Sequence, residues 1–570
     1  MNWLIKTLPF RCMQALLPLA LFGVLTGCGS LPLGTARDYQ AHYLLIHKDG
    51  IAIKVPDAAQ PLPNPSDDLD TNQTLTTPEL RQQIELTIRA GLDAHVERIQ
   101  AHQVASCREV LQLLVIVHGG MNGYEHSAAH MTELLNPPLS QPPGAAPPAQ
   151  PESRALLNET CYYPLFINWD SDFGDSWADD LFRYRFGVRN PVFASLTSPI
   201  QAAGRVISSA AHVPSSLFHQ GFTIAEGIRG GAEQGDPASG LALDTLANTP
   251  GIALSTAFLP FTQGFGAPSW SIMKRRVDEA VAGRLSPDDT SKSGAARTLA
   301  QALKNWVTKK NGQWVWRDSV VPVQVTIVGH SMGAMIINRL LEETEQAPLL
   351  ESTHAAPQAS GGSAAPSTPA GPTSPVTRIV YLAPACSIDE AEHLLMPYLE
   401  RHQDTEFWLF NLNRRDESRE IPGKGWALFV PRGTLLTWID TFLEDEYAPG
   451  EGRLGWVRSL GEYYGINPEP SVKRSFSDYF APNNTVPLTQ NSSQALPRPH
   501  ARTLWRDLRV NWTVTDKPER LHAYETTRRV RQHGHHPEVH SDFMKAQYFR
   551  QVLCQVDSTA FPSPSACQTP

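Results

Sequence analysis

Continuous apolar runs of strand length recur along the chain, and segments with helical spacing separate them. The runs are Leu111 to Val117, Tyr163 to Trp169, Val323 to Val328, Arg378 to Pro384 and Phe407 to Leu412. Runs that are apolar at nearly every position are typical of strands covered on both faces, as in a mainly parallel sheet. Strands that alternate with helices imply right-handed crossovers between them. The pattern therefore predicts an α/β protein with a mainly parallel, doubly wound sheet.

The pattern before the first run predicts a hairpin and then a helix. Two short apolar segments within His42 to Val55 flank Lys48-Asp49-Gly50, and a D-G pair in that position is typical of a hairpin turn. A linker rich in Pro and Asp follows from 56 to 74. We expect the helix to begin after this linker, with Thr77 as its N-cap and Pro78 in its first turn.

Later segments interrupt the alternation of strands and helices. Residues 190 to 272 carry few charges and interleave apolar residues with Gly, Ser and Ala, so this segment is not a solvated linker. It forms either a helical cap packed on the core or a mobile lid whose apolar inner face covers an acyl site. A helix over Ala295 to Lys309 then leads back to the sheet. Residues 350 to 376 are a low-complexity surface loop, and residues 430 to 500 form a further insertion.

Length and composition place the chain among globular proteins. Its 570 residues, 41% of them hydrophobic and 18% charged, suffice for one large domain with insertions. A formal net charge of -9 argues against nucleic acid as a partner. We divide the chain into a signal segment (1–28), an N-terminal hairpin and linker (29–75), an α/β domain (76–555) and a C-terminal tail (556–570).

The first 28 residues predict export and lipid attachment. A basic start precedes an apolar stretch from Leu16 to Val24, and Leu25-Thr26-Gly27-Cys28 closes it with small residues before a cysteine. This ending resembles the lipobox of bacterial lipoprotein signals, which implies that Cys28 is lipidated and becomes the mature N-terminus. The alternative is a secretory signal without lipid. Gly29 stands where an aspartate would resemble an inner-membrane retention signal, so the outer membrane is favoured. No later apolar run is long enough to span a bilayer.

The remaining cysteines allow disulfides, because the chain is expected outside the cytoplasm. Cys554 and Cys567 would close a short loop, and Cys107 and Cys161 each precede an apolar run and could pair. Spacing alone leaves the connectivity open. The odd cysteine is expected to be Cys386, buried beside a strand.

The run from Val323 leads into Gly329-His330-Ser331-Met332-Gly333, and an apolar-faced helix follows. A serine on a tight turn between a strand and a helix has a strained backbone and an exposed Oγ. The glycines allow neighbouring backbone to approach closely. The Met332 amide at the helix N-terminus would face negative charge that develops on a bound acyl group. Ser331 is therefore the candidate nucleophile.

The strand Leu111 to Val117 ends in His118-Gly119-Gly120. Together with the serine turn, this segment resembles the H-G oxyanion loop of the α/β-hydrolase superfamily, in its lipase and esterase branch. The resemblance covers roughly Leu111 to Leu553 and implies an α/β-hydrolase fold. It also implies that an amide of Gly120 or Met121 joins that of Met332 in binding an oxyanion.

In that superfamily the acid lies between the serine and the histidine along the chain. Asp416 follows the second strand after Ser331, which is the usual position, and Asp389 follows the first such strand, which some lipases use. We favour Asp416 over Asp389, because the acid must end a strand in order to orient the imidazole.

A histidine-rich segment near the end of the chain supplies the candidate base. His540, followed by Ser541, Asp542 and an aromatic residue before an apolar helix, resembles the last catalytic loop of esterases. The other candidates are His533, His535 and His536. These histidines with Glu538 and Asp542 could alternatively chelate a metal, but they lack a specific ligand spacing, so no metal is expected. The final strand of the sheet is expected near Leu508 to Val514.

The resemblance implies a serine esterase or lipase that acts on an ester or lipid substrate without a cofactor. Ser331 would attack the carbonyl, His540 would accept and return the proton, and Asp416 would hold the imidazole. Two alternatives remain: an acyltransferase that uses the same residues, and a non-catalytic envelope lipoprotein with this fold. The chain would contact the membrane through its lipid anchor, and the sequence does not indicate an oligomeric state.

Overall fold

The computed structural model describes the following parts of the chain: residues 40–54, 74–101, 109–120, 160–185, 188–209, 266–283, 294–317, 319–342, 374–420, 433–444, 453–455, 469–470, 521–525 and 540–561, with isolated residues between 127 and 135 and between 217 and 264. The lipidation candidate Cys28, the oxyanion candidate Met121 and the histidines 533, 535 and 536 lie outside these residues.

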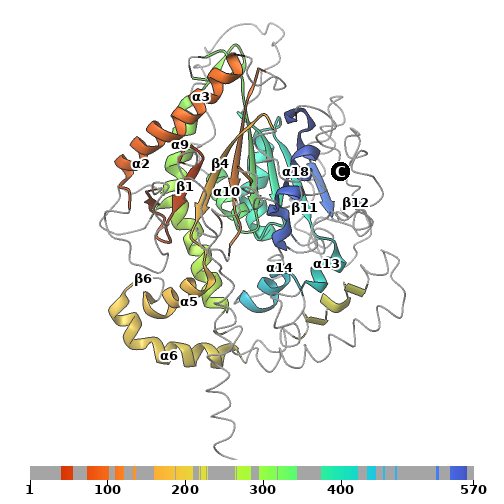
Figure 1. Ribbon diagram of the computed structural model, residues 1–570. Coiled ribbons are helices and arrows are strands. Elements are labelled where there is room, and N and C mark those ends of the chain that lie inside the picture. The colour runs from red at the N-terminus through yellow and green to blue at the C-terminus, as the bar shows by residue number, and fades with distance from the viewer. Residues whose placement is uncertain are drawn as a thin grey trace, which may run out of the picture.

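A nine-stranded sheet forms the centre of the protein, in the order β12-β13-β11-β10-β9-β3-β4-β1-β2 (Figure 1). Its strands are β1 (Tyr43–Ile46), β2 (Ala52–Ile53), β3 (Leu111–Val117), β4 (Tyr162–Trp169), β9 (Val323–His330), β10 (Val376–Leu382), β11 (Glu406–Asn411), β12 (Glu469–Pro470) and β13 (Leu521–Glu525). Neighbouring strands run parallel except β1 and β2, which are antiparallel. The protein is therefore an α/β protein with a mostly parallel mixed sheet.

Helices and two short ribbons surround this sheet. The helices are α2 (Thr77–Gln83), η2 (Ile84–Ile88), α3 (Arg89–Gln100), α5 (Phe173–Phe182), α6 (Pro191–Ser209), α9 (Ala295–Trp306), α10 (Gly333–Leu341), α11 (Ile388–Glu390), η5 (Ala391–Leu395), α12 (Met396–Arg401), α13 (Arg414–Arg419), α14 (Leu435–Trp438), η6 (Ile439–Leu443), η10 (His540–Met544), α18 (Ala546–Val556), η11 (Ser558–Ala560) and an unlabelled helix over residues 266–282. The antiparallel ribbons pair β5 (Tyr184–Arg185) with β6 (Val188–Arg189), and β7 (Val307–Lys310) with β8 (Gln313–Trp316).

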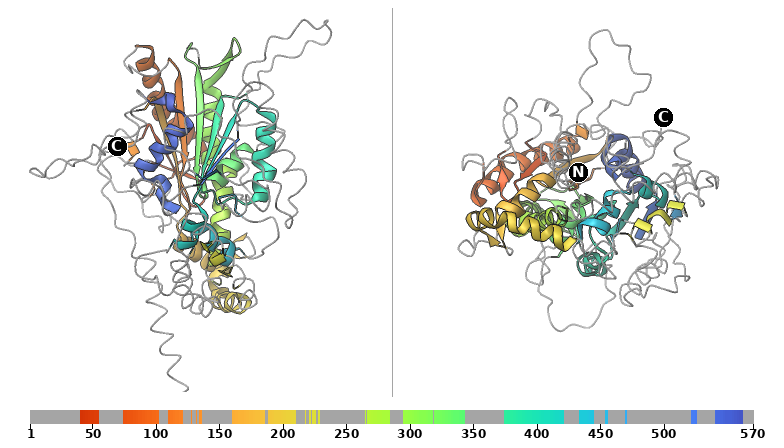
Figure 2. Two further views of the ribbon diagram at one scale, coloured as in Figure 1. Left: turned by 90° about the vertical axis from the view of Figure 1, so that its right-hand side faces the viewer. Right: turned by 90° about the horizontal axis from the view of Figure 1, so that it is seen from below.

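The two faces of the sheet are covered by different parts of the chain. Figure 2 shows α18 on one face and α10 on the other. The central strands β3 and β4 are buried at every position, as their uniformly apolar sequences predict. Charged and polar helices, including α5 and α13, follow the carboxyl ends of the strands, at the lower end of Figure 1. Any site built at that end therefore has the sheet as a rigid base.

The structure confirms the predicted strands and corrects several boundaries. The hairpin forms around Gly50, whose φ is 73°, but β1 pairs with β4, so the hairpin belongs to the main sheet. Thr76, not Thr77, is the N-cap of α2, because Thr76 forms a reciprocal capping box with Glu79. The helix α9 ends at Trp306, since the following residues form β7. The predicted final strand, residues 508–514, lies outside the described residues, and β13 occupies the position beside β11.

A buried arginine joins the insertions to the loop after β10. The guanidinium of Arg453 donates from Nε to Asp440 (2.9 Å) and from Nη1 to the carbonyl of Ala385 (3.1 Å), and it also pairs with Glu444. Glu444 in turn accepts from the indole of Trp270 (2.7 Å). Arg453 is 2% exposed, so each charge here needs its partner. The helix over 266–282, η6 and the loop after β10 are thus held as one unit.

The bonding state of the described cysteines agrees with part of the prediction. Cys161 and Cys554 are each disulfide-bonded, and Cys386 is free and fully buried, as expected. Cys107 and Cys567 lie outside the described residues, so the predicted pairings stay predictions. Burial raises the pKa of the Cys386 thiol well above its ordinary value, which makes it a poor nucleophile. Among the described helices, none is long and apolar enough to cross a membrane.

Candidate functional site

Ser331 lies at the junction of β9 and α10 with an unusual backbone conformation. Its φ is 51°, in the left-handed region that residues with a side chain rarely adopt. The Ser331 Oγ has no hydrogen-bond partner in the structure, and the residue is only 1% exposed. The strained turn and the unbonded hydroxyl are those expected of a nucleophile on a strand-to-helix turn. The expectation of an exposed Oγ is wrong, because Gly119 in the loop after β3 packs against Ser331.

Close backbone contacts explain why glycines flank this turn. A Cβ on Gly333 would overlap the carbonyl oxygen of Val117 at the end of β3. A Cβ on Gly119 would lie 2.8 Å from both the Cβ of Ser331 and the Nδ1 of His330. The ends of β3 and β9 therefore meet at a distance that only glycine permits, and the H-G-G segment lies directly beside the serine.

The predicted oxyanion donors are arranged around the same turn. Met332 is the N-cap residue of α10. In the first turn the Ala334 amide donates to the Ser331 carbonyl (3.2 Å) and the Met335 amide to the Met332 carbonyl (3.0 Å), so the Met332 amide remains the candidate donor. Gly120 packs against the Met332 side chain and against Met273 of the helix over 266–282. The site thus has a helix N-terminus on one side and the loop after β3 on the other. Met121, the alternative donor, lies outside the described residues.

His118 has a structural role in this loop. Its Nε2 accepts from the Trp169 amide (3.0 Å), which places the ring proton on Nδ1, and Nδ1 donates to the Gly119 carbonyl (2.6 Å). The Trp169 indole also donates to the His118 carbonyl (3.1 Å). These bonds fasten the end of β3 to the end of β4. His118 consequently holds Gly119 and Gly120 in place beside Ser331.

His540 is brought next to the serine turn from a distant part of the chain. Its ring lies 5.0 Å from the ring of His330, centre to centre, and its carbonyl accepts from His330 Nε2 (3.0 Å). The imidazole is 5% exposed, and neither of its nitrogens has a hydrogen-bond partner. Burial, with a smaller contribution from His330, holds the pKa of His540 well below its ordinary value. The ring is therefore neutral at pH 7 and able to accept a proton. No hydrogen bond joins it to Ser331 in this structure.

Glu420 holds the backbone of His540 in this position. Its Oε2 accepts from the His540 amide at 2.8 Å. Burial raises the pKa of Glu420 to about 7, with the nearby carboxylate of Asp542 adding to the effect and the His540 amide opposing it. The His540 amide and carbonyl are thus both fixed, one by Glu420 and the other by His330. No sequence pattern indicates Glu420, apart from its position after the candidate Asp416.

The two candidate acids occupy different environments. Asp416 is buried in the first turn of α13, where its carboxylate accepts from the Asn413 side chain (2.7 Å). The same helix leads to Glu420, so Asp416 lies on the element that contacts His540. Asp389 is 39% exposed on α11 and pairs with His393 at 3.5 Å. None of the described contacts joins either carboxylate to the His540 ring, so the choice of acid stays a prediction.

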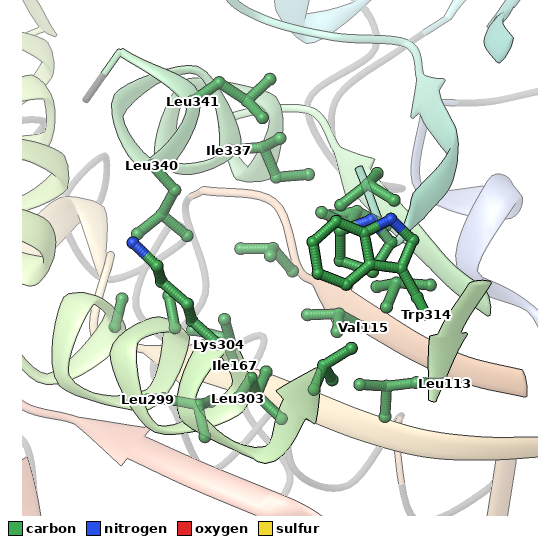
Figure 3. Close-up of a pocket in the computed structure, with 18 residues that line it drawn as sticks. Leu113, Val115, Ile167, Leu299, Leu303, Lys304, Trp314, Ile337, Leu340 and Leu341 are labelled. Carbon is green, nitrogen blue, oxygen red and sulfur yellow. The ribbon is translucent and has the colours of Figure 1, made fainter. Parts of the chain in front are cut away.

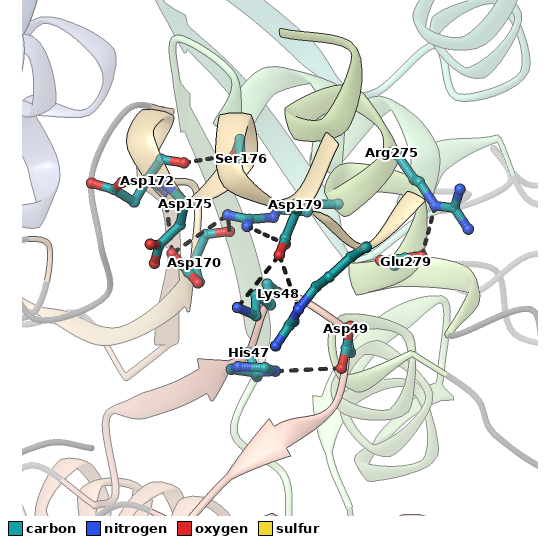
Figure 4. Close-up of polar contacts among 12 residues, drawn as sticks. His47, Lys48, Asp49, Asp170, Asp172, Asp175, Ser176, Asp179, Arg275 and Glu279 are labelled. Carbon is teal, nitrogen blue, oxygen red and sulfur yellow. Dashed lines mark hydrogen bonds and ion pairs between the residues drawn. The ribbon is translucent and has the colours of Figure 1, made fainter. Parts of the chain in front are cut away.

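Buried charges gather at the carboxyl ends of β1 and β4 (Figure 4). Asp170, which follows β4, is an ion-pair partner of Arg276 at 3.7 Å, and Asp179 of α5 pairs with Arg276 (2.8 Å) and with Lys48 (3.7 Å). Burial raises the pKa of Asp170 to about 6. Because these carboxylates are engaged by cations of the chain, the cluster fastens α5 and the helix over 266–282 to the sheet.

An apolar cavity of about 60 Å³ lies away from the serine turn, between the sheet, α9 and α10 (Figure 3). Its lining includes Leu113 and Val115 of β3, Leu299 of α9, Ile337 of α10 and Trp314 of β8. It offers no polar group to chemistry other than Lys304, so it belongs to the core and not to the candidate site. Among the described residues, no group of His, Cys, Asp and Glu is arranged to hold a metal ion.

Comparisons with protein families, curated proteins and solved structures found no match to this chain. A functional assignment therefore depends on the geometry of the described residues.

Replacing Glu420 by glutamine should change how stability depends on pH. A carboxyl whose pKa is raised on folding stabilises the fold most below its unfolded pKa, near 4.5, and that contribution is lost as the pH rises to about 7. In Glu420→Gln the amide stays neutral, so the loss over this window should shrink by up to roughly 3 kcal/mol. Unfolding free energies measured by denaturant titration between pH 4.5 and 8 check this.

Glu79→Gln is the matched control, because hydrogen bonds from Thr76 lower the pKa of the exposed Glu79 carboxylate. Because the ionised carboxylate contributes its stability above about pH 4.5 and loses it below, Glu79→Gln should shift the curve by a constant amount between pH 4.5 and 8 without changing its slope. Parallel curves for the wild type and Glu420→Gln would show that Glu420 does not titrate in this window.

Proposed function

We propose that this chain is a serine hydrolase of carboxylic esters with an α/β-hydrolase fold. The observation that carries the proposal is the positive φ of Ser331 at the junction of β9 and α10. A strained conformation at a residue with a side chain persists only where the surroundings hold it, and such residues cluster at functional sites. The contacts of Gly119, Gly329 and Gly333 supply those surroundings.

The neighbours of Ser331 support acyl transfer in particular. The Met332 amide at the start of α10 and the Gly120 amide in the loop after β3 are the candidate donors of an oxyanion hole. His540 is neutral and has two unbonded nitrogens, so a nitrogen is available to accept the Ser331 proton, while burial weakens it as a base. A carboxylate bonded to the other nitrogen, the role proposed for Asp416, would restore that basicity. Apo structures often lack the hydrogen bond between nucleophile and base, which forms when substrate binds.

The proposed reaction proceeds in two steps, acylation of Ser331 and then hydrolysis of the acyl-serine. The Ser331 Oγ forms a bond to the ester carbonyl carbon while His540 takes its proton, and the alcohol leaves with that proton. Water then attacks the acyl-serine, His540 again takes and returns a proton, and the carboxylic acid is released. In both steps the negative charge on the carbonyl oxygen is bound by amides of Met332 and Gly120. An acceptor alcohol in place of water would make the same machinery an acyltransferase.

Ser331→Ala should abolish labelling by a fluorophosphonate probe and hydrolysis of short p-nitrophenyl esters. His540→Ala should lose nearly as much, because serine and histidine act as a unit. Active-site labelling is read by gel fluorescence and hydrolysis by absorbance. Ser374→Ala, which changes a buried serine near the start of β10, is the control and should be labelled like the wild type. A folded wild-type protein that takes up no probe would favour the non-catalytic lipoprotein instead.

Asp416→Asn should lower kcat by several orders of magnitude, whereas Asp389→Asn should be close to wild type. The reason is that Asp416 is buried on the helix that leads to Glu420, while the Asp389 carboxylate is partly exposed and pairs with His393. Steady-state hydrolysis of the same esters separates the two variants. The reverse result would assign the acid to the strand that directly follows Ser331 in the sequence.

We also propose that Cys28 is lipidated and holds the chain at the cell envelope, in keeping with the Leu25-Thr26-Gly27-Cys28 sequence. Mass spectrometry of the mature protein should then find acyl chains on an N-terminal Cys28. An unmodified N-terminus at another residue would remove the lipid anchor from the proposal without affecting the hydrolase chemistry.

A further inference from the structure

The helix α6 presents its apolar residues outward. Val192, Leu196, Ile200 and Ile207 are 73%, 75%, 76% and 74% exposed. At 100° per residue these positions fall within one narrow stripe of the helix surface. A surface helix normally buries such a stripe against the core. The apolar residues of α6 thus face away from the core, and the choice between cap and lid for residues 190 to 272 stays a prediction.

The opposite side of α6 is polar and fixed to the body of the protein. Arg185 donates to the Ala194 carbonyl (2.5 Å) and to the Thr197 hydroxyl (2.6 Å) on α6. Asp180 of α5 accepts from Gln201 (2.8 Å) and Arg205 (3.2 Å). Thr197, Gln201 and Arg205 lie on the side of the helix away from the apolar stripe. Hydrogen bonds and an ion pair thus hold the polar face of α6 against the protein. Its apolar face points outward, whereas most surface helices bury that face.

The location of α6 favours contact with a large external surface. Figure 1 shows it at the lower end of the described part of the protein, beyond α5 and away from the sheet. Seen from below in Figure 2, α6 lies in front of the other helices. Phe182 and Val188, beside α6 in the chain, add exposed apolar side chains (46% and 64%). Large exposed apolar patches of this kind mark interaction sites.

We propose that the apolar stripe of α6 docks in the interface of a lipid bilayer. The only charged residue of α6, Arg205, is engaged by Asp180, so the stripe carries no charge that could pair with a protein partner. Helices that lie in the membrane plane bury such a face among the headgroups and acyl chains. Residues 29 to 39, which separate Cys28 from the first described residue, span at most roughly 40 Å. A lipid on Cys28 would therefore hold residue 40, and with it the described part of the protein, close to the same membrane.

The test uses the mature chain from residue 28 with Cys28→Ser, so that no acyl chain is present. We expect it to co-sediment with phosphatidylcholine vesicles, and we expect binding to persist in 1 M salt because the stripe is uncharged. The double variant Leu196→Glu/Ile200→Glu should reduce the partition coefficient at least about tenfold, and Leu196→Ala/Ile200→Ala should reduce it less. Val320→Glu is the control: Val320 is 82% exposed but precedes β9, at the other end of the strands.

Each outcome bears on the proposal. Thermal unfolding curves show whether the Glu variant is folded, and the Ala variant provides the test if it is not. Wild-type binding that only the α6 variants weaken supports the bilayer. The wild-type chain could instead fail to bind vesicles and form dimers, as measured by size-exclusion chromatography with light scattering. If the α6 variants dissociate those dimers, the stripe binds a second copy of the chain. A monomer without vesicle binding would also overturn the proposal. Neither result depends on Ser331 chemistry or on lipidation of Cys28.

Discussion

The steric fit between the ends of β3 and β9 is the constraint on which the candidate site depends. The turn at Ser331 brings α10 against the Val117 carbonyl, and any side chain at Gly333 would separate them. Because the two strands are direct neighbours in register, this contact also places the loop after β3 beside the serine. The strain at Ser331 costs on the order of 1–3 kcal/mol, and the packing of a central parallel sheet can sustain it.

The carboxyl end of the sheet combines this strain with an unusual density of buried charge. Asp170, Glu420 and Asp440 all have pKa values raised by burial, to about 6, 7 and 6. Removing one partner from such a cluster leaves an unpaired buried charge, which costs about 3–5 kcal/mol. The apolar cavity beside Trp314 lies on one face of the sheet, where α9 and α10 cover it.

The sequence predicted the elements that repeat a simple pattern. The buried strands and the Ser331 turn follow from runs of apolar residues and from glycine spacing, which are local properties. The N-cap of α2 was misplaced by one residue because Thr76 and Thr77 are equally suited to capping by type. The role of Glu420 was missed because it depends on the His540 amide, 120 residues away. The orientation of α6 was also missed, since periodicity shows that a helix has two faces but not which one the protein covers.

The bonds of Arg453 make the insertions dependent on one another. Its guanidinium is shared by Asp440 and Glu444 of the later insertion and by the Ala385 carbonyl, while Glu444 also holds Trp270 of the earlier one. A relative of this protein that lost only the later insertion would leave the buried indole N–H of Trp270 without its acceptor, Glu444. The two insertions should consequently be gained, lost or exchanged together during evolution, although they are far apart in the chain.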